Sequence, residues 1–347
     1  MLIDTVLVIL IVALAAYAVL GGADFGAGFW DLTAGGARRG ARLRGLVHRS
    51  MGPVWEANHV WLIVVLVILW TCFPHGFGPM METLYVPLFL AAVGIIFRGA
   101  AYALRGEAAS IAEARVLGAV FALSSVVTPF FLGCAVGAVA SGQVPADGDP
   151  NAPFASWTGA TALWIGALSV VTGAYVAAVF LAADSVRAGA PDLANAFRRR
   201  ALGSAAVAGA MALGGLLVIR ADERDLYDGL TSGGGLAMVA VSAAVGILTL
   251  WLLWTNRFEI ARYTSAVAVG AILAGWALAQ RPDFLPGELT LEEAAAGDAT
   301  LTATLVALVV ALLVIVPSIA LLYRLTLAGR LSGALGPIVD AEDGHER

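Results

Sequence analysis

The chain has 347 residues, of which 60% are apolar and only 13% are charged, with a net charge of −5. A soluble domain carries about 25% charged residues, and the mean hydropathy here is +0.87. These values exclude an ordinary soluble enzyme, a nucleic-acid-binding protein, a disordered chain and a disulfide-rich scaffold. They predict an all-α polytopic membrane protein.

Nine apolar runs, bounded by charged residues or Gly/Pro clusters, are each close to the roughly 20 residues that a helix needs to cross a bilayer. The first run carries Asp4 and lacks a basic leader, so we expect a retained helix rather than a cleaved signal peptide. The predicted spans are 3–23, 54–73, 84–104, 117–139, 158–182, 203–219, 236–254, 264–279 and 302–322.

The basic residues, all of them arginine, predict the orientation because positive residues stay on the cytoplasmic side of short loops. Sixteen arginines fall on one side of the predicted spans and three on the other, which predicts an outside N-terminus and a cytoplasmic C-terminus. The larger group is Arg38, Arg39, Arg42, Arg44, Arg49, Arg105, Arg115, Arg187, Arg198, Arg199, Arg200, Arg257, Arg262, Arg324, Arg330 and Arg347; the smaller is Arg220, Arg224 and Arg281.

A weak internal repeat predicts the domain organisation. Asp24 and Asp184 each follow an alanine and each precede an Arg-Arg pair by fourteen residues. We therefore expect one membrane domain over 1–332, made of two similarly oriented four-helix halves and one extra helix. The halves cover about 1–139 and 158–279, the extra helix covers 302–322, a short helix lies near Leu291–Ala296, and 333–347 is a disordered cytoplasmic tail.

Four ionisable residues are expected inside the membrane near its cytoplasmic face: Asp24, Glu56, His59 and Arg98. Such groups cost several kcal/mol in hydrocarbon, so they are functional candidates. We expect one of the carboxylates to neutralise Arg98, and we expect Asp31 at the membrane interface. Two carboxylates, an imidazole and a guanidinium predict a proton-conducting site that opens to the cytoplasm.

Three members of this cluster also have a purely structural explanation. Glu56 could complement the dipole of a helix that begins after Pro53, His59 could donate to a neighbouring carbonyl, and Arg98 could extend to the lipid headgroups.

The histidines and cysteines limit the redox chemistry that this chain can perform. Of His48, His59, His75 and His345, only His59 is expected inside the membrane, so no histidine pair can hold a haem. The sequence therefore predicts no catalytic, metal or cofactor ligands on this chain. Cys72 and Cys134 fit no metal or redox motif and are expected to pack as small apolar side chains.

Three sequence blocks resemble subunit II of the cytochrome bd-type quinol oxidases. They are GGADFGAG at 21–28, GPVWEANHVWL at 52–62, and FRG…LR between Phe97 and Arg105; FLPGELTLEEAAA at 284–296 also resembles the family's last outer loop. One difference is Ala103, where the family often has an acidic residue, so any role of that carboxylate does not carry over.

This resemblance implies a membrane heterodimer that oxidises quinol and reduces O₂ to water. It implies that two b-type haems and one d-type haem belong to subunit I. Subunit II would hold subunit I and contribute to the cytoplasmic proton route, with Glu56 lining the route and Asp24 and Arg98 supporting it. Small accessory subunits, quinone or lipid between the subunits, and a bacterial cytoplasmic membrane location are also implied.

Two alternatives remain open from the sequence. A proton-coupled secondary transporter could use the same charged cluster, although transporters usually have broken helices in both halves. The chain could also be a scaffold for the same partner, without a role in proton transfer.

Overall fold

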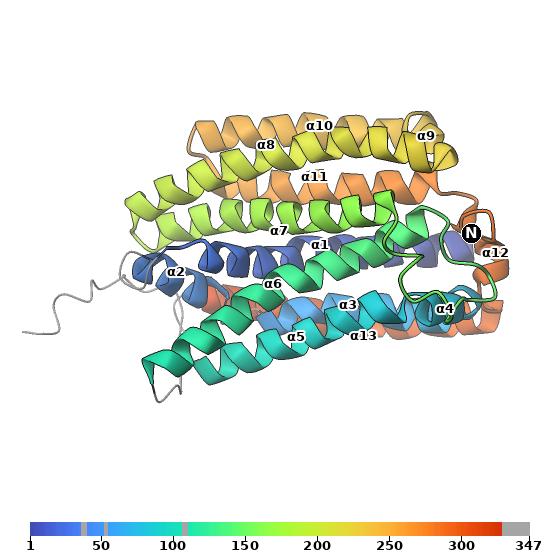
Figure 1. Cartoon of the computed structure of the whole chain (residues 1–347), viewed down its shortest axis with the longest axis horizontal. Helices are drawn as coiled ribbons and strands as arrows, with labels where there is room; N and C mark the ends of the chain where they lie inside the picture. The colour runs from blue at the N-terminus through green and yellow to red at the C-terminus, as the bar shows by residue number, and fades with distance from the viewer. Residues whose placement is uncertain (36–39, 52–54, 106–109, 328–347) are drawn as a thin grey trace, which may run out of the picture.

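The computed structural model describes residues 1–35, 40–51, 55–105 and 110–327. Its long helices lie roughly alongside one another in a bundle (Figure 1). They are α1 (Leu2–Leu32), α3 (Trp55–Cys72), α5 (Tyr85–Arg105), α6 (Ile111–Ala140), α7 (Ala160–Arg187), α8 (Pro191–Asp222), α10 (Gly233–Trp254), α11 (Phe258–Ala279) and α13 (Asp298–Leu327).

The short elements lie at the two ends of this bundle. Helix α2 (Ala41–Met51) lies at one end, and α4 (Pro74–Thr83), α9 (Arg224–Leu230) and α12 (Leu291–Ala294) lie at the other, with a two-stranded antiparallel hairpin of β1 (Asp283–Leu285) and β2 (Leu289–Thr290). We call these the α2 end and the α12 end. In the predicted orientation the α2 end faces the cytoplasm.

Within the described residues, eight helices are long and apolar enough to cross a membrane. Helix α3 is joined to α4 by a 117° bend, and the number of candidate spans rises to nine if this bent pair is counted as one span. The prediction of an all-α polytopic membrane protein is confirmed, whereas the orientation and the division into halves stay predictions. The predicted tail 333–347 lies outside the described residues.

Several predicted boundaries were wrong because apolar runs mark only the part of a helix that crosses hydrocarbon. Helix α8 begins at Pro191 rather than at 203, and α11 begins at Phe258 rather than at 264. Residues 74–83, which lie between two predicted spans, form α4, so His75 is on a helix. Pro74 lies in the first turn of this helix, where its missing N–H costs nothing. The short helix near 291–296 is confirmed as α12, where Thr290 and Glu293 form a capping box.

Helices α1 and α7 cross at very close range, and this crossing positions the C-terminal part of α1. A Cβ atom built on Gly26 would lie 1.9 Å from the carbonyl oxygen of Gly173. Small residues allow such close approach between membrane helices. The indole of Trp30 also donates to the carbonyl of Ala174 at 2.8 Å. The crossing therefore holds α1, and with it Asp24, against the second half of the chain.

Two large apolar clusters fill the bundle. The cluster toward the α2 end includes Leu46, Phe197 and Ala183, and the cluster toward the α12 end includes Ile68 and Leu285. Cys134 and Cys72 are buried free thiols in the second cluster, as expected for small apolar side chains. Helix α13 packs on α3 and α1 at the edge of the bundle, and most of its surface is exposed.

Candidate functional site

The carboxyl group of Asp24 is buried inside the bundle, on the part of α1 nearest the α2 end. Its residue is 3% exposed, and its Oδ2 atom accepts a hydrogen bond of 2.7 Å from Nδ2 of Asn58 on α3. The same Asn58 nitrogen lies 3.3 Å from the carbonyl oxygen of Leu20. One amide therefore bridges the Asp24 carboxylate and the main chain one turn before it.

The guanidinium of Arg98 on α5 lies in the same buried region. Its Nη2 donates to the main-chain carbonyl of Asp24 at 2.9 Å, and its Nε donates to the hydroxyl of Ser125 at 3.1 Å. The guanidinium carbon is 5.0 Å from the ring centres of both Phe25 and Phe121. Aromatic faces attract a cation through their quadrupole, so Arg98 is enclosed by two rings and two hydrogen-bond acceptors. With an exposure of 2%, it does not extend to lipid headgroups.

The prediction that a carboxylate neutralises Arg98 was only partly correct. Asp24 and Arg98 do lie together, but the guanidinium donates its hydrogen bond to the Asp24 main-chain carbonyl, while the carboxylate accepts from Asn58. A buried charge costs several kcal/mol unless a nearby opposite charge or hydrogen bonds offset that cost. Here each group has its own hydrogen bonds, because Asn58 binds the Asp24 carboxylate and Arg98 binds Ser125 and the Asp24 carbonyl.

His59 is brought to this site by α3, the helix that also carries Asn58. Its ring makes edge-to-face contacts with Tyr17 and Phe25, with ring centres 6.0 Å apart in both cases. The Tyr17 hydroxyl is buried and has no hydrogen-bond partner among the described residues.

The side chain of Glu56 lies outside the described residues. The main chain of α3 begins at Trp55, so Glu56 is in the first turn of the helix that carries Asn58 and His59. Its distance from Asp24 and Arg98 stays a prediction.

Asp31, which was expected at the membrane interface, is buried within the protein, and its depth in the membrane stays a prediction. Its side chain is 4% exposed, and its carboxylate lies 3.9 Å from Nε of Arg44 on the segment that follows α1. The helix that continues to Leu32 carries Asp31 into the protein interior, where Arg44 approaches it.

Sequence reasoning missed three polar residues of the site: Asn58, Ser125 and Tyr17. Asn58 lies within the GPVWEANHVWL block, and a side-chain amide inside an apolar span is a signal that could have identified it. Ser125 belongs to a Ser-Ser pair in the span 117–139, but serines are common on membrane helices because they bond to their own helix. Ser125 does so here, donating to the Phe121 carbonyl at 2.7 Å.

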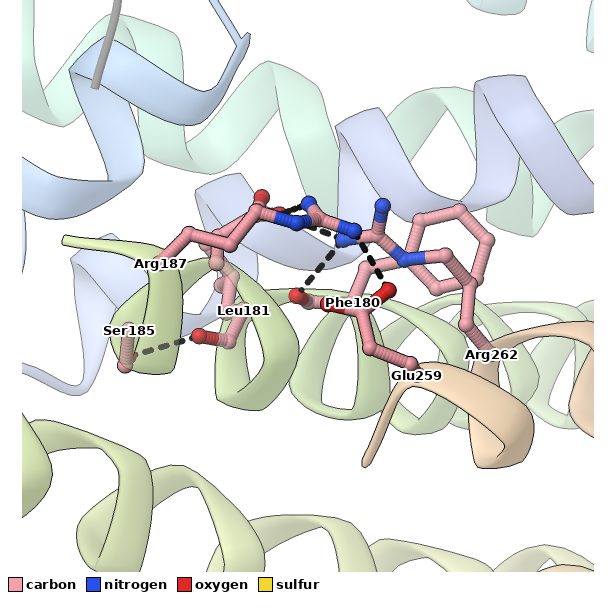
Figure 2. A network of polar contacts seen from close by, with 7 residues as sticks. Phe180, Leu181, Ser185, Arg187, Glu259 and Arg262 are labelled. Atoms are coloured by element: carbon pink, nitrogen blue, oxygen red, sulfur yellow. Dashed lines mark hydrogen bonds and ion pairs between the residues drawn. The ribbon is translucent and has the colours of Figure 1, made fainter. Parts of the chain in front are cut away.

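A second buried carboxylate, Asp184 on α7, is the counterpart of Asp24 in the predicted repeat, but its partners differ. Arg262 on α11 contacts its Oδ1 atom, and Arg187 donates to the same atom at 2.7 Å. Arg187 also pairs with Glu259 at 2.5 Å, and Arg262 lies 4.7 Å from the ring centre of Phe180 (Figure 2). Direct ion pairs surround Asp184, so its network has the features of a structural link between α7 and α11.

Within the described residues no group of three or more His, Cys, Asp or Glu side chains is arranged to hold a metal ion. The ring of His59 contacts the rings of Tyr17 and Phe25.

Comparisons with known proteins agree with this architecture. Residues 2–326 match the family described as "Cytochrome bd terminal oxidase subunit II". The chain belongs to this family. It is also similar to "Cytochrome bd ubiquinol oxidase subunit 2" of Bacillus subtilis (strain 168), with 27% identity over 148 residues, which are 43% of each chain. The matched part thus spans less than half the length of that relative.

The fold of this family member is similar to that in the structure of the bd oxidase from Geobacillus thermodenitrificans. The TM-score is 0.74 at 24% identity, and the match covers 93% of this chain and 98% of the solved chain. At this identity the similarity establishes the fold alone.

Proposed function

We propose that this chain is the non-haem subunit of a quinol:O₂ oxidoreductase in a bacterial cytoplasmic membrane. Its partner is a haem-bearing subunit I, which carries the two b-type haems and the d-type haem that transfer the electrons. Family membership supports this assignment. Small accessory subunits, and lipid or quinone between the subunits, belong to the same proposal.

We propose that the buried cluster of Asp24, Asn58, His59 and Arg98, together with Glu56, forms part of the route by which protons enter the complex from the cytoplasm. The observation that carries this proposal is the position of Asp24 and Arg98. Both are buried, and they lie on the parts of α1 and α5 that end nearest α2, the short helix whose sequence carries the arginines of 42–49. No packing requirement explains a carboxylate and a guanidinium there, because apolar residues would fill the space at lower cost.

The roles within this route follow from the contacts. Glu56, in the first turn of α3, receives protons at the cytoplasmic side. Asp24 passes them on, and Asn58 fixes the direction in which the Asp24 carboxylate points. Arg98 sets the electrostatic potential of the site, and its two aromatic neighbours hold it in place. His59 assists through hydrogen bonds or bound water.

The transporter alternative has no specific observation in its favour. In the described residues one helix pair, α3 with α4, is sharply bent, and this bend lies toward the α12 end, away from Asp24. Family membership favours the oxidase assignment.

The test is oxygen consumption by the intact oxidase with a quinol as the electron donor. We expect the Glu56→Gln and Asp24→Asn variants to lower turnover by at least about tenfold, because a relayed proton is lost at each position. The haem absorption spectrum of the complex should remain intact, since no haem ligand is altered.

Asp192→Asn is the matched control, because Asp192 is an exposed carboxylate at the same end of the bundle, paired with Arg42 at 2.8 Å. It should leave turnover unchanged. Wild-type rates in both test variants would contradict the proton role while leaving the assignment to the oxidase intact.

A further inference from the structure

Three polar side chains lie on one face of α1 at intervals of seven residues: Tyr17, Asp24 and Asp31. Seven residues are almost two whole turns of an α-helix, with a drift of about 20°, so the three side chains form a column. All three residues are buried, with exposures of 6%, 3% and 6% in chain order. Asp31 is the member nearest the α2 end, about 10 Å along the helix from Asp24. A second buried carboxylate therefore follows Asp24 on the same helix face, toward that end of the bundle.

A hydroxyl group lies against α1 between the two carboxylates. Gly28 is four residues after Asp24 and three before Asp31, so it lies on the same face as both. A Cβ atom built on Gly28 would lie 2.1 Å from Oγ of Ser125, so only a glycine lets this hydroxyl approach α1 so closely. The hydroxyl accepts a hydrogen bond of 3.1 Å from Nε of Arg98. Because a hydroxyl can both donate and accept, a group that can relay a proton is present between the two carboxylates.

Asp31 is connected to α2 through Arg44. The carboxylate of Asp31 lies 3.9 Å from Nε of Arg44. The same arginine lines a cavity of about 10 Å³ beside α2, together with Val47, His48, Met51, Tyr102 and Phe121. This volume is close to what one water molecule needs. His48, whose ring stacks on Tyr102 with 4.8 Å between ring centres, is exposed. A water-sized space that is lined by an exposed residue therefore reaches the arginine beside Asp31.

Two explanations of Asp31 make different demands on its surroundings. If its carboxylate only fixes α2 to α1, the ion pair with Arg44 is the important feature. A buried ion pair is weak evidence for stability, because apolar residues of similar volume often stabilise as much. If the carboxylate carries protons, its position in the column is the important feature, and Arg44 only offsets its charge. The spacing from Asp24 and the hydroxyl beside Gly28 favour the second explanation.

We propose that Asp31 takes up protons at the α2 end and transfers them to Asp24. The inference rests on the proposed proton route and adds to it a residue that acts in series with Glu56. A proton from water adds to a carboxylate oxygen of Asp31. That O–H bond then breaks as the Ser125 hydroxyl accepts the proton and releases its own, and an O–H bond forms on Asp24. One proton moves, no electron is transferred, and each relaying group returns to its starting state.

The experiment is proton uptake by the intact oxidase during a single turnover, followed with a pH-sensitive dye and normalised to haem content. We expect Asp31→Asn to slow uptake at least about tenfold, because the amide cannot bind and release the proton. Asp31→Glu keeps a carboxyl group on the same helix face, so it should take up protons faster than Asp31→Asn.

Arg44→Gln separates proton transfer from a structural role of the ion pair. It removes the pair from the other side, together with the two hydrogen bonds of 3.0 Å that Arg44 donates to the Gly35 carbonyl. A purely structural role would therefore suffer at least as much as in Asp31→Asn. Our proposal predicts uptake near the wild-type rate in Arg44→Gln, because the carboxylate is still present.

Asp184→Asn is the matched control for the loss of a buried, ion-paired carboxylate. Asp184 is 9% exposed, and its arginine partners lie on α7 and α11 rather than on the column of α1. The assembled Asp184→Asn complex should take up protons at the wild-type rate.

Three results would overturn the proposal. Wild-type uptake in Asp31→Asn alongside slow uptake in Asp24→Asn would remove Asp31 from the route but leave the route itself standing. Wild-type uptake in both variants would contradict the route and this proposal together. Equal slowing in Asp31→Asn and Arg44→Gln would show that the ion pair has a structural role only.

The double variant Asp31→Asn with Arg44→Gln keeps the proposal testable if Asp31→Asn alone does not assemble. It removes both charges, so neither is left buried without its partner. We expect uptake at least about tenfold slower than in Arg44→Gln alone, and equal rates in these two variants would overturn the proposal.

Discussion

The close crossing of α1 and α7 makes a sharp prediction for Gly26→Ala. The new methyl carbon would lie 1.9 Å from the carbonyl oxygen of Gly173 and 2.7 Å from the nitrogen of Ala174. Both are main-chain atoms, so the helices must separate by about 1.5 Å to reach the 3.4 Å at which ordinary contact begins. Overpacking of this kind costs about 3 kcal/mol or more, and alanine returns about 1 kcal/mol of helix propensity. We expect a net loss of about 2 kcal/mol.

Gly22→Ala is the matched control, because it makes the same change one turn earlier on the same helix. A methyl group at Gly22 would lie 3.7 Å from the Cα of Gly173, which is ordinary contact. It should therefore be neutral or stabilising by up to about 1 kcal/mol.

The assay for this pair is unfolding of the purified complex in mild detergent, followed by tryptophan fluorescence against denaturant or temperature. Equal stability of Gly26→Ala and Gly22→Ala would refute the reasoning, because it would mean that the two helices do not cross at Gly26.

The remaining predictions concern polar contacts. Asn58→Leu should destabilise the complex by about 1.5–3 kcal/mol, the value of a hydrogen bond to a charged group. In a double-mutant cycle with Asp24→Asn, most of this loss should appear as coupling energy between the two positions. Additive effects of the two substitutions would contradict the contact. The Glu293 carboxylate accepts hydrogen bonds from the main chain and the hydroxyl of Thr290, which hold the pKa of Glu293 below its ordinary 4.5. The stability that this carboxylate gives to α12 is present above pH 4.5 and is lost as the pH falls through the lower pKa of the folded state. The protection of α12 amides from hydrogen exchange should follow this pH dependence, and Glu293→Gln should remove it. Arg262→Gln should markedly lower thermal stability because it breaks a buried ion pair, whereas Glu259→Gln at a half-exposed position should change it little; equal effects would argue against the network.

The sequence predicts the membrane-crossing helices well because each span must be apolar over its whole length. This constraint is local, so it can be read without knowing which helix lies next to which. It also identifies Asp24, His59 and Arg98, since ionisable residues are rare inside such spans, and the structure brings all three together. The weaker parts of the prediction are helix ends, where polar residues continue the helix beyond hydrocarbon, as in the first turns of α8.

The partners of the cluster could not be predicted because they depend on contacts between distant segments. Asn58 reaches Asp24 across 34 residues of sequence, and Arg98 reaches the Asp24 carbonyl across 74. Nothing in the local pattern distinguishes Ser125, which binds Arg98, from serines that bond only to their own helix.

The central claim, that protons reach the partner's haems through the Asp24 site, is tested most directly by proton uptake during a single turnover. The reduced complex is mixed with O₂, and the loss of protons from the bulk is followed with a pH-sensitive dye alongside the haem absorbance. The account predicts that Asp24→Asn slows the uptake of protons while the initial binding of O₂ keeps its wild-type rate. Uptake at the wild-type rate and stoichiometry in Asp24→Asn would contradict it.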